Sequence, residues 1–197
     1  MPIPFRNAAQ IEAGGNAAFI RIVAGPDPRV RIGAIFQMNA LGEPIEFAFN
    51  SMQVPSSPLW RGSDLRRHVN RMLLASLFQA AQRSPLVLCC LAREIDSQTF
   101  TEDVQVQIAV CRLGEADDIT CLAESETCED MSSSEGSIHL FWAGRAPGPE
   151  APHRKLVHAL ARRGILLEPF DRILAGLGEA YPPRDIESSS YADPIPT

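Results

Sequence analysis

Apolar and polar residues alternate with two different periods along this chain, and the two periods predict two kinds of element. Over residues 63–82 the apolar positions recur at three- and four-residue spacing, which marks one face of a helix; they are Leu65, Val69, Met72, Leu73, Leu77 and Ala80. Ser63 can cap this helix, because its hydroxyl can accept an otherwise unpaired N–H of the first turn. Pro85 bars its continuation. We therefore expect a helix over residues 63–82.

A period of two residues predicts the strands. Strict alternation, as in residues 30–39, is typical of a strand with one wetted face, whereas the unbroken apolar run 86–92 is typical of a central strand covered on both faces. We expect strands at residues 17–24, 30–39, 45–50, 86–92, 104–110 and 138–142. Residues 119–123 could pair back on 104–110 as a hairpin.

The last third of the chain adds two helical patterns, over residues 152–163 and 169–181. The fold class predicted is mixed α/β or α+β: a mixed sheet with a central helix, 63–82, on one face and two C-terminal helices. Residues 1–181 are expected to form a single globular domain. The acidic, serine-rich stretch 124–136 predicts a mobile loop and residues 182–197 a disordered tail, because both are too polar to repay the entropy of ordering.

Charge is distributed unevenly in a chain of 197 residues with a net charge of −6. Residues 61–83 hold five arginines and one aspartate. Residues 113–144 have no Lys or Arg and contain eight acids, which are Glu115, Asp117, Asp118, Glu124, Glu126, Glu129, Asp130 and Glu135. Five cysteines without regular spacing, no secretory signal pattern and no apolar run near ~20 residues predict a cytoplasmic protein with no membrane segment.

The order strand, strand, strand, helix, strand over residues 17–95 resembles the opening of the RNase H-like superfold, although no sequence motif carries the resemblance. Nucleases of that superfold hold metal ions with carboxylates, and the first carboxylate usually sits on the first strand. Here that strand offers Arg21 and no acid. Glu94 and Asp96, after the central strand, match the place of a second carboxylate, and Asp171 on the last helix is a candidate for another.

Other chemistry has less support in the sequence. The acids of 115–135 lack the spaced loop that fixes calcium ligands. Cys111, Cys121 and Cys128 form no C-x-x-C pair beside His139, so a structural zinc site is not expected. Nucleotide-binding and hydrolase motifs are absent. We therefore expect no cofactor and no metal ligands; the nuclease alternative would require Mg or Mn.

A basic face on the helix 63–82 is the candidate for nucleic-acid binding. Its residues are Arg66, Arg67, Asn70 and Arg71, which could follow a phosphate backbone. The same residues also suit the solvent side of an amphipathic helix. A second basic patch is formed by Arg154, Lys155, Arg162 and Arg163.

Two functional interpretations follow. The missing catalytic motifs, the polar tail and the acidic stretch favour a non-catalytic interaction or accessory subunit of a nucleic-acid-processing assembly, with an unidentified protein partner and nucleic acid as a further partner. This interpretation leans against an enzyme. The alternative is an RNase H-like metal-dependent nuclease that uses the strand-end carboxylates Glu94, Asp96 and Asp171.

Overall fold

The computed structural model describes residues 15–27, 29–55, 59–133 and 136–182. These form a seven-stranded mixed sheet in the order β3-β2-β1-β4-β5-β7-β6. The strands β1 and β4 are parallel, as are β4 and β5, and the other neighbours are antiparallel. The strands are β1 (Asn16–Ala24), β2 (Val30–Asn39), β3 (Pro44–Gln53), β4 (Val87–Leu91), β5 (Ala109–Glu115), β6 (Glu126–Ser133) and β7 (Gly136–Ala143).

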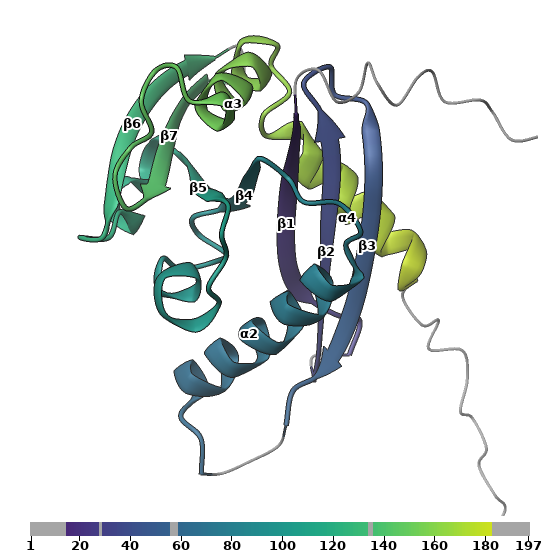
Figure 1. Ribbon diagram of the computed structural model, residues 1–197. Helices are drawn as coiled ribbons and strands as arrows, with labels where there is room; N and C mark the ends of the chain where they lie inside the picture. The colour runs from purple at the N-terminus through teal and green to yellow at the C-terminus, as the bar shows by residue number, and fades with distance from the viewer. Residues whose placement is uncertain (1–14, 28, 56–58, 134–135, 183–197) are drawn as a thin grey trace, which may run out of the picture.

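Helices cover both faces of this sheet. The helix α2 (Gly62–Ala80) crosses one face of β1–β3, and α4 (Glu168–Ala180) runs behind the same strands, while α3 (Pro152–Arg162) lies toward β6 and β7 (Figure 1). Two short segments, the π-helix η1 (Thr99–Asp103) and the 3-10 helix η2 (Ala116–Cys121), flank β5. The mixed α/β class and the central helix are therefore confirmed.

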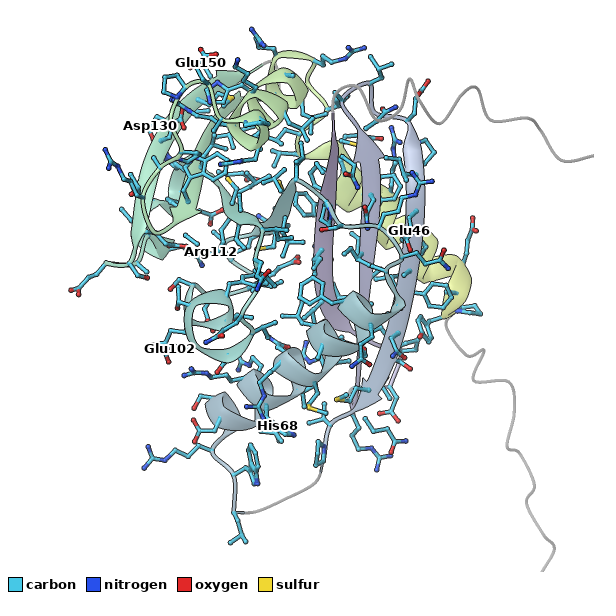
Figure 2. The ribbon with its side chains drawn as sticks, in the orientation of Figure 1. Glu46, His68, Glu102, Arg112, Asp130 and Glu150 are labelled. Atoms are coloured by element: carbon cyan, nitrogen blue, oxygen red, sulfur yellow. The ribbon has the colours of Figure 1, made fainter. Side chains whose placement is uncertain are left out.

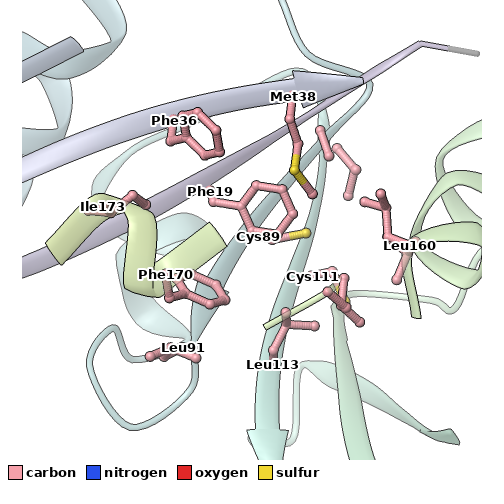
Figure 3. Close-up of a cluster of buried hydrophobic side chains, with 14 of the residues drawn as sticks. Phe19, Phe36, Met38, Cys89, Leu91, Cys111, Leu113, Leu160, Phe170 and Ile173 are labelled. Carbon is pink, nitrogen blue, oxygen red and sulfur yellow. The ribbon is translucent and has the colours of Figure 1, made fainter. Parts of the chain in front are cut away.

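The sheet separates two apolar cores. Leu73, Leu74 and Leu77 of α2 pack with Ile20 and Ile35 on one face. On the other face, residues of α3 and α4 pack against Phe19, Phe36 and Cys89 (Figure 3). All five residues of β4 are buried, because this strand contributes side chains to both cores, as its unbroken apolar run predicts.

The helix prediction was right in place and wrong in detail. The helix begins at Gly62, its N-cap residue is Arg61, and no side chain caps it, so the expected cap by Ser63 is absent. The helix ends at Ala80. Met72 is 44% exposed and lies off the buried stripe, whereas Leu73 is fully buried. The predicted stripe thus includes two exposed residues, Met72 and Ala80, and omits the buried Leu74.

The prediction of a mobile loop at 124–136 was wrong, because β6 occupies Glu126–Ser133 and pairs with β7 along its length. Its acids meet cations from distant elements: Glu126 binds Arg112 of β5, and Glu129 binds Arg154 of α3. Local composition could not show these pairs. Residues 134–135 and the expected tail beyond residue 182 lie outside the described residues.

Two smaller predictions also fail around β5. This strand begins at Ala109, five residues later than expected, while Val104, Val106 and Ile108 pack against the α2 core without forming a strand. The expected hairpin arm 119–123 largely falls in η2, the 3-10 helix. Within the part of the chain that the structure describes, no helix has the length and apolar character to cross a membrane.

Candidate functional site at the ends of β1 and β4

An Arg–Glu pair joins β1, three residues before that strand ends, to the segment that follows the parallel strand β4. Ile20 of β1 lies opposite Cys90 of β4, so Arg21 extends toward the segment that follows β4. Its Nε donates to Oε2 of Glu94 at 3.1 Å, and its Nη2 donates to Oε1 of the same carboxylate. The two side chains are 12% and 16% exposed. A bidentate, largely desolvated pair of this kind is among the stronger polar contacts in proteins.

The start of α4 completes this strand-end site. Arg21 Nη1 also contacts the carbonyl oxygen of Phe170 at 3.5 Å, and Asp171 follows in the first turn of the helix with an exposed side chain. Phe170 packs edge-on against Phe19 of β1 with ring centroids 5.5 Å apart. Because that contact fixes the helix on the sheet, it sets the position of the carbonyl that Arg21 reaches.

Arg112 of β5 holds the segment that carries Glu94. Its guanidinium is 2% exposed and donates to the carbonyls of Ala92 at 3.3 Å and Ile95 at 2.9 Å, on either side of Glu94. Arg112, labelled in Figure 2, also donates two hydrogen bonds to the carboxylate of Glu126, at 2.7 and 2.9 Å. The sequence analysis missed Arg112. The available signal was an arginine between Cys111 and Leu113, within an apolar strand.

Asp96 has a local role instead of joining this site. Its Oδ1 accepts the backbone N–H of Thr99 at 3.0 Å and the hydroxyl of Thr99 at 3.2 Å, which organises the turn into η1. Of the candidate acids, the structure therefore places Glu94 in the Arg21 pair, Asp171 on the exposed surface of the first turn of α4, and Asp96 in a turn.

The strand-end residues do not fit a two-metal centre in this arrangement. Both oxygens of Glu94 already accept hydrogen bonds from Arg21, and a cation there would face the positive guanidinium. Among the described residues, no group of three metal-ligating side chains includes Glu94, Asp96 or Asp171. Arg21 thus supplies fixed positive charge where the superfold usually carries its first carboxylate.

The expectation of no cofactor is contradicted by a group of side chains elsewhere in the structure. Cys128, Asp130 and His139, on β6 and β7, offer donor atoms that all lie within 4.8 Å of one another and could hold a metal ion. The sequence analysis considered Cys128 and His139 but dismissed them, because zinc motifs are usually short paired spacings. Strand pairing brings these residues together without such a motif.

The basic face of α2 lies on the other side of the sheet from α4. Arg67 donates hydrogen bonds to Asp103, Glu102 and Gln98, and those to the Asp103 and Glu102 carboxylates raise the pKa of its guanidinium. Arg66 and Arg71 are exposed, and Asn70 is half-buried. The structure therefore leaves Arg66 and Arg71 accessible but does not bring them to the Arg21–Glu94 pair.

The second basic patch forms a shallow pocket on α3. It is lined by Pro149, Arg154, Lys155, His158 and Arg162. Glu129 of β6 lies 2.7 Å from Arg154 and 2.9 Å from the ring of His158, and Glu150 pairs with Lys155. Much of the positive charge of this pocket is therefore balanced within the protein.

Comparisons with known proteins bear on the fold. No family model and no curated protein sequence matches the chain. Among solved structures it is similar to endonuclease V from Streptomyces avermitilis, with a TM-score of 0.54 and 12% identity over 85% of this chain and 83% of that one. Endonuclease V from Bacillus subtilis has a TM-score of 0.52 and 10% identity, covering 84% and 81%. Endonuclease V from Ciona intestinalis, in complex with a 24mer DNA that contains an inosine followed by a ribo-adenosine, has a TM-score of 0.52 and 7% identity, covering 86% and 89%.

The chain has an RNase H-like fold. This confirms the resemblance inferred from element order, and the likeness spans most of both chains. It also corrects the functional interpretation: the three solved structures named above are endonucleases, which contradicts the non-catalytic accessory subunit and favours the nuclease alternative. The expected protein partner, which rested on the accessory interpretation, loses its basis with it.

Proposed function

We propose that this chain is a nuclease that acts on nucleic acid at the strand-end pair Arg21–Glu94. The observation that carries the proposal is the convergence of this pair with the start of α4 beside the end of β4, in a fold that solved endonuclease V structures share. Fold alone does not determine activity. The proposal therefore depends on what this pair can do to a phosphodiester.

Arg21 is suited to bind the scissile phosphate. A guanidinium presents two parallel N–H groups that match two phosphate oxygens as well as they match a carboxylate. A phosphate that took the place of Glu94 on Arg21 would release the carboxylate beside the reacting phosphorus. Because the pair is mostly desolvated, its charges act through a medium that screens them less than water does.

Glu94 would then act as the general base. It takes a proton from a water molecule while the water oxygen forms a bond to phosphorus, the ester P–O bond breaks, and the leaving oxygen receives a proton from solvent. The positive charge that stabilises the phosphate comes from Arg21. Arg112 positions Glu94 through the carbonyls on either side of it.

The exposed residues of α2 extend this proposal to the rest of the substrate. Arg66 and Arg71, with Asn70, are the proposed contacts to more distant phosphates, whereas Arg67 is already neutralised by two carboxylates. Binding should weaken steeply with salt, because each neutralised phosphate releases counterions. A cytoplasmic location is consistent with five free cysteines.

The experiment is a cleavage assay on end-labelled single- and double-stranded DNA, RNA and an RNA–DNA hybrid, with Mg²⁺, Mn²⁺ or a chelator. We expect shorter products from the wild type and a loss of about 100-fold or more in Arg21→Ala, because a fixed charge on the phosphate is removed. Arg29→Ala is the matched control, since Arg29 is 82% exposed in a neighbouring turn. Absence of products on every substrate would contradict the proposal.

A further inference from the structure

The antiparallel pair β6 and β7 brings three metal-binding side chains to one face of the sheet. Asp130 lies directly opposite His139 in the register, and Cys128 lies two residues before Asp130. Side chains two residues apart on a strand point to the same face. As a result, Sγ of Cys128, a carboxylate oxygen of Asp130 and a ring nitrogen of His139 lie within 4.8 Å of one another.

The surroundings hold these donors in place. The ring of His139 stacks on Phe141, with centroids 6.0 Å apart and an angle of 24° between the planes. Phe141 in turn lies 5.8 Å from the guanidinium of Arg112, which anchors β6 through Glu126. The His139 side chain is only 13% exposed, whereas Asp130 is 73% exposed (Figure 2). The group is therefore fixed on its inner side and open to solvent on its outer side.

We propose that Cys128, Asp130 and His139 bind a zinc ion on the outer edge of the sheet. A thiolate and an imidazole select zinc and similar borderline ions over Mg²⁺ or Ca²⁺, which prefer oxygen donors. Three protein donors complete a tetrahedral zinc site when a water or another exchangeable ligand takes the fourth position. The open side at Asp130 leaves space for that ligand.

A zinc ion would replace the hydrogen bonds that now join the three side chains. Oδ1 of Asp130 lies 2.6 Å from Nδ1 of His139 and 3.6 Å from Sγ of Cys128, so the metal-free group uses the same three atoms for its own contacts. When zinc binds, Cys128 loses its thiol proton to solvent and His139 carries its ring proton on Nε2, which frees Nδ1 for the metal. Asp130 keeps its negative charge. The exchange releases one proton from the thiol.

This site is separate from the proposed nuclease centre, since none of its ligands belongs to the strand-end site. An ion bound at this site would stabilise the edge of the sheet. The strand β6 ends the sheet order, and an ion shared by β6 and β7 would tie this edge to its neighbour. An ion that binds the folded state alone also raises the free energy of unfolding by mass action.

The test is a titration of the full-length protein with Co²⁺, whose bond to a thiolate gives a charge-transfer absorption. We expect one ion per chain with a thiolate band, displaced by Zn²⁺. Cys128→Ser should remove the band and weaken Zn²⁺ binding at least about tenfold, because a ligand is lost. Cys121→Ser is the matched control, since Cys121 is also half-buried but lies outside the group.

Thermal unfolding provides the second readout. Zn²⁺ should raise Tm of the wild type and of Cys121→Ser but leave that of Cys128→Ser and His139→Gln unchanged, with far-UV circular dichroism to verify folding. The proposal is overturned if the wild type shows no thiolate band, if the band persists in Cys128→Ser, or if Cys121→Ser alone removes it. Neither result depends on nuclease activity, so the two proposals can fail independently.

Discussion

At the scale of single residues, the buried pair Arg112–Glu126 should matter most to stability. Its side chains are 3% and 1% exposed, and Arg112 also satisfies backbone carbonyls after β4. Arg112→Leu leaves Glu126 buried without its cation, so we expect a loss of about 3–5 kcal/mol in the free energy of unfolding, measured by urea denaturation.

The control for this prediction is another arginine near β4. Arg93 lies 3.7 Å from Glu115, and both side chains are more than half exposed. Arg93→Leu should therefore cost at most about 1 kcal/mol, because exposed ion pairs contribute little. Equal losses in the two variants would show that Arg112 has no special role in the fold.

The strand-end site shows how far single residues could be assigned from sequence. Alternation placed Arg21 on the first strand, and its position marked the missing carboxylate. The sequence also offered Glu94 and Asp171 as candidates. It could not show that Arg21 binds Glu94, because these residues are 73 positions apart and their contact depends on the parallel pairing of β1 with β4.

At the scale of elements, α2 allows a direct test of its buried face. Leu73 is fully buried, whereas its neighbour Met72 is 44% exposed. Leu73→Ala should lower the free energy of unfolding by about 2–5 kcal/mol, because it leaves a cavity against the sheet. Met72→Ala should cost no more than about 0.5 kcal/mol. Thermal or urea unfolding measures both losses. A larger loss for Met72→Ala than for Leu73→Ala would show that the face of α2 assigned to the core is the wrong one.

The strand β6 carries a second prediction, which concerns pH. Burial tends to raise the pKa of Glu129, but hydrogen bonds from Arg154 and Trp142 outweigh it and lower the pKa below its ordinary value. A lowered pKa in the folded state contributes stability above the ordinary glutamate pKa of about 4.3, and this stability is lost as the pH falls through the folded value.

Glu129→Gln should therefore be less stable than the wild type at pH 7, by about 1–3 kcal/mol, because charged hydrogen bonds are lost. The difference should shrink as the pH falls below about 4.3, where the carboxyl of the unfolded chain becomes protonated, and should vanish once the pH has passed the lowered pKa of the folded protein. Urea unfolding at several pH values measures it, with the exposed Glu179→Gln as the control. A difference that stayed constant with pH would contradict the assigned contacts.

Elements with strong periodicity were predictable, and those stabilised by distant charges were not. The central strand β4 and the helix α2 follow from apolar spacing within their own residues. The strand β6 has too few apolar residues for such a prediction, and it is stabilised by Arg112 and Arg154, which lie on other elements. The group formed by Cys128, Asp130 and His139 could not be predicted from the sequence for a related reason, because only the register of β6 with β7 brings Asp130 next to His139.

At the scale of the whole molecule, the order of elements was sufficient for the fold class but not for the function. Three strands, a helix and a strand indicated an RNase H-like sheet, and the solved structures of that fold agree over most of the chain. The absence of catalytic motifs pointed away from an enzyme. The likeness to solved endonucleases contradicts the accessory interpretation that rested on this absence. A motif search covers only residues close in sequence, so it could not detect a pair such as Arg21 and Glu94, which are 73 positions apart.

The central claim is that Glu94 and Arg21 cleave a phosphodiester, and a single-turnover measurement with Glu94→Gln tests it most directly. Binding and cleavage of one labelled oligonucleotide are followed in the same samples, with the exposed Glu179→Gln as the control. We expect the cleavage rate of Glu94→Gln to fall by about 100-fold or more, because the general base is lost. Its binding should be unchanged or tighter, because the carboxylate no longer competes for Arg21. Cleavage by Glu94→Gln at the wild-type rate would contradict the account.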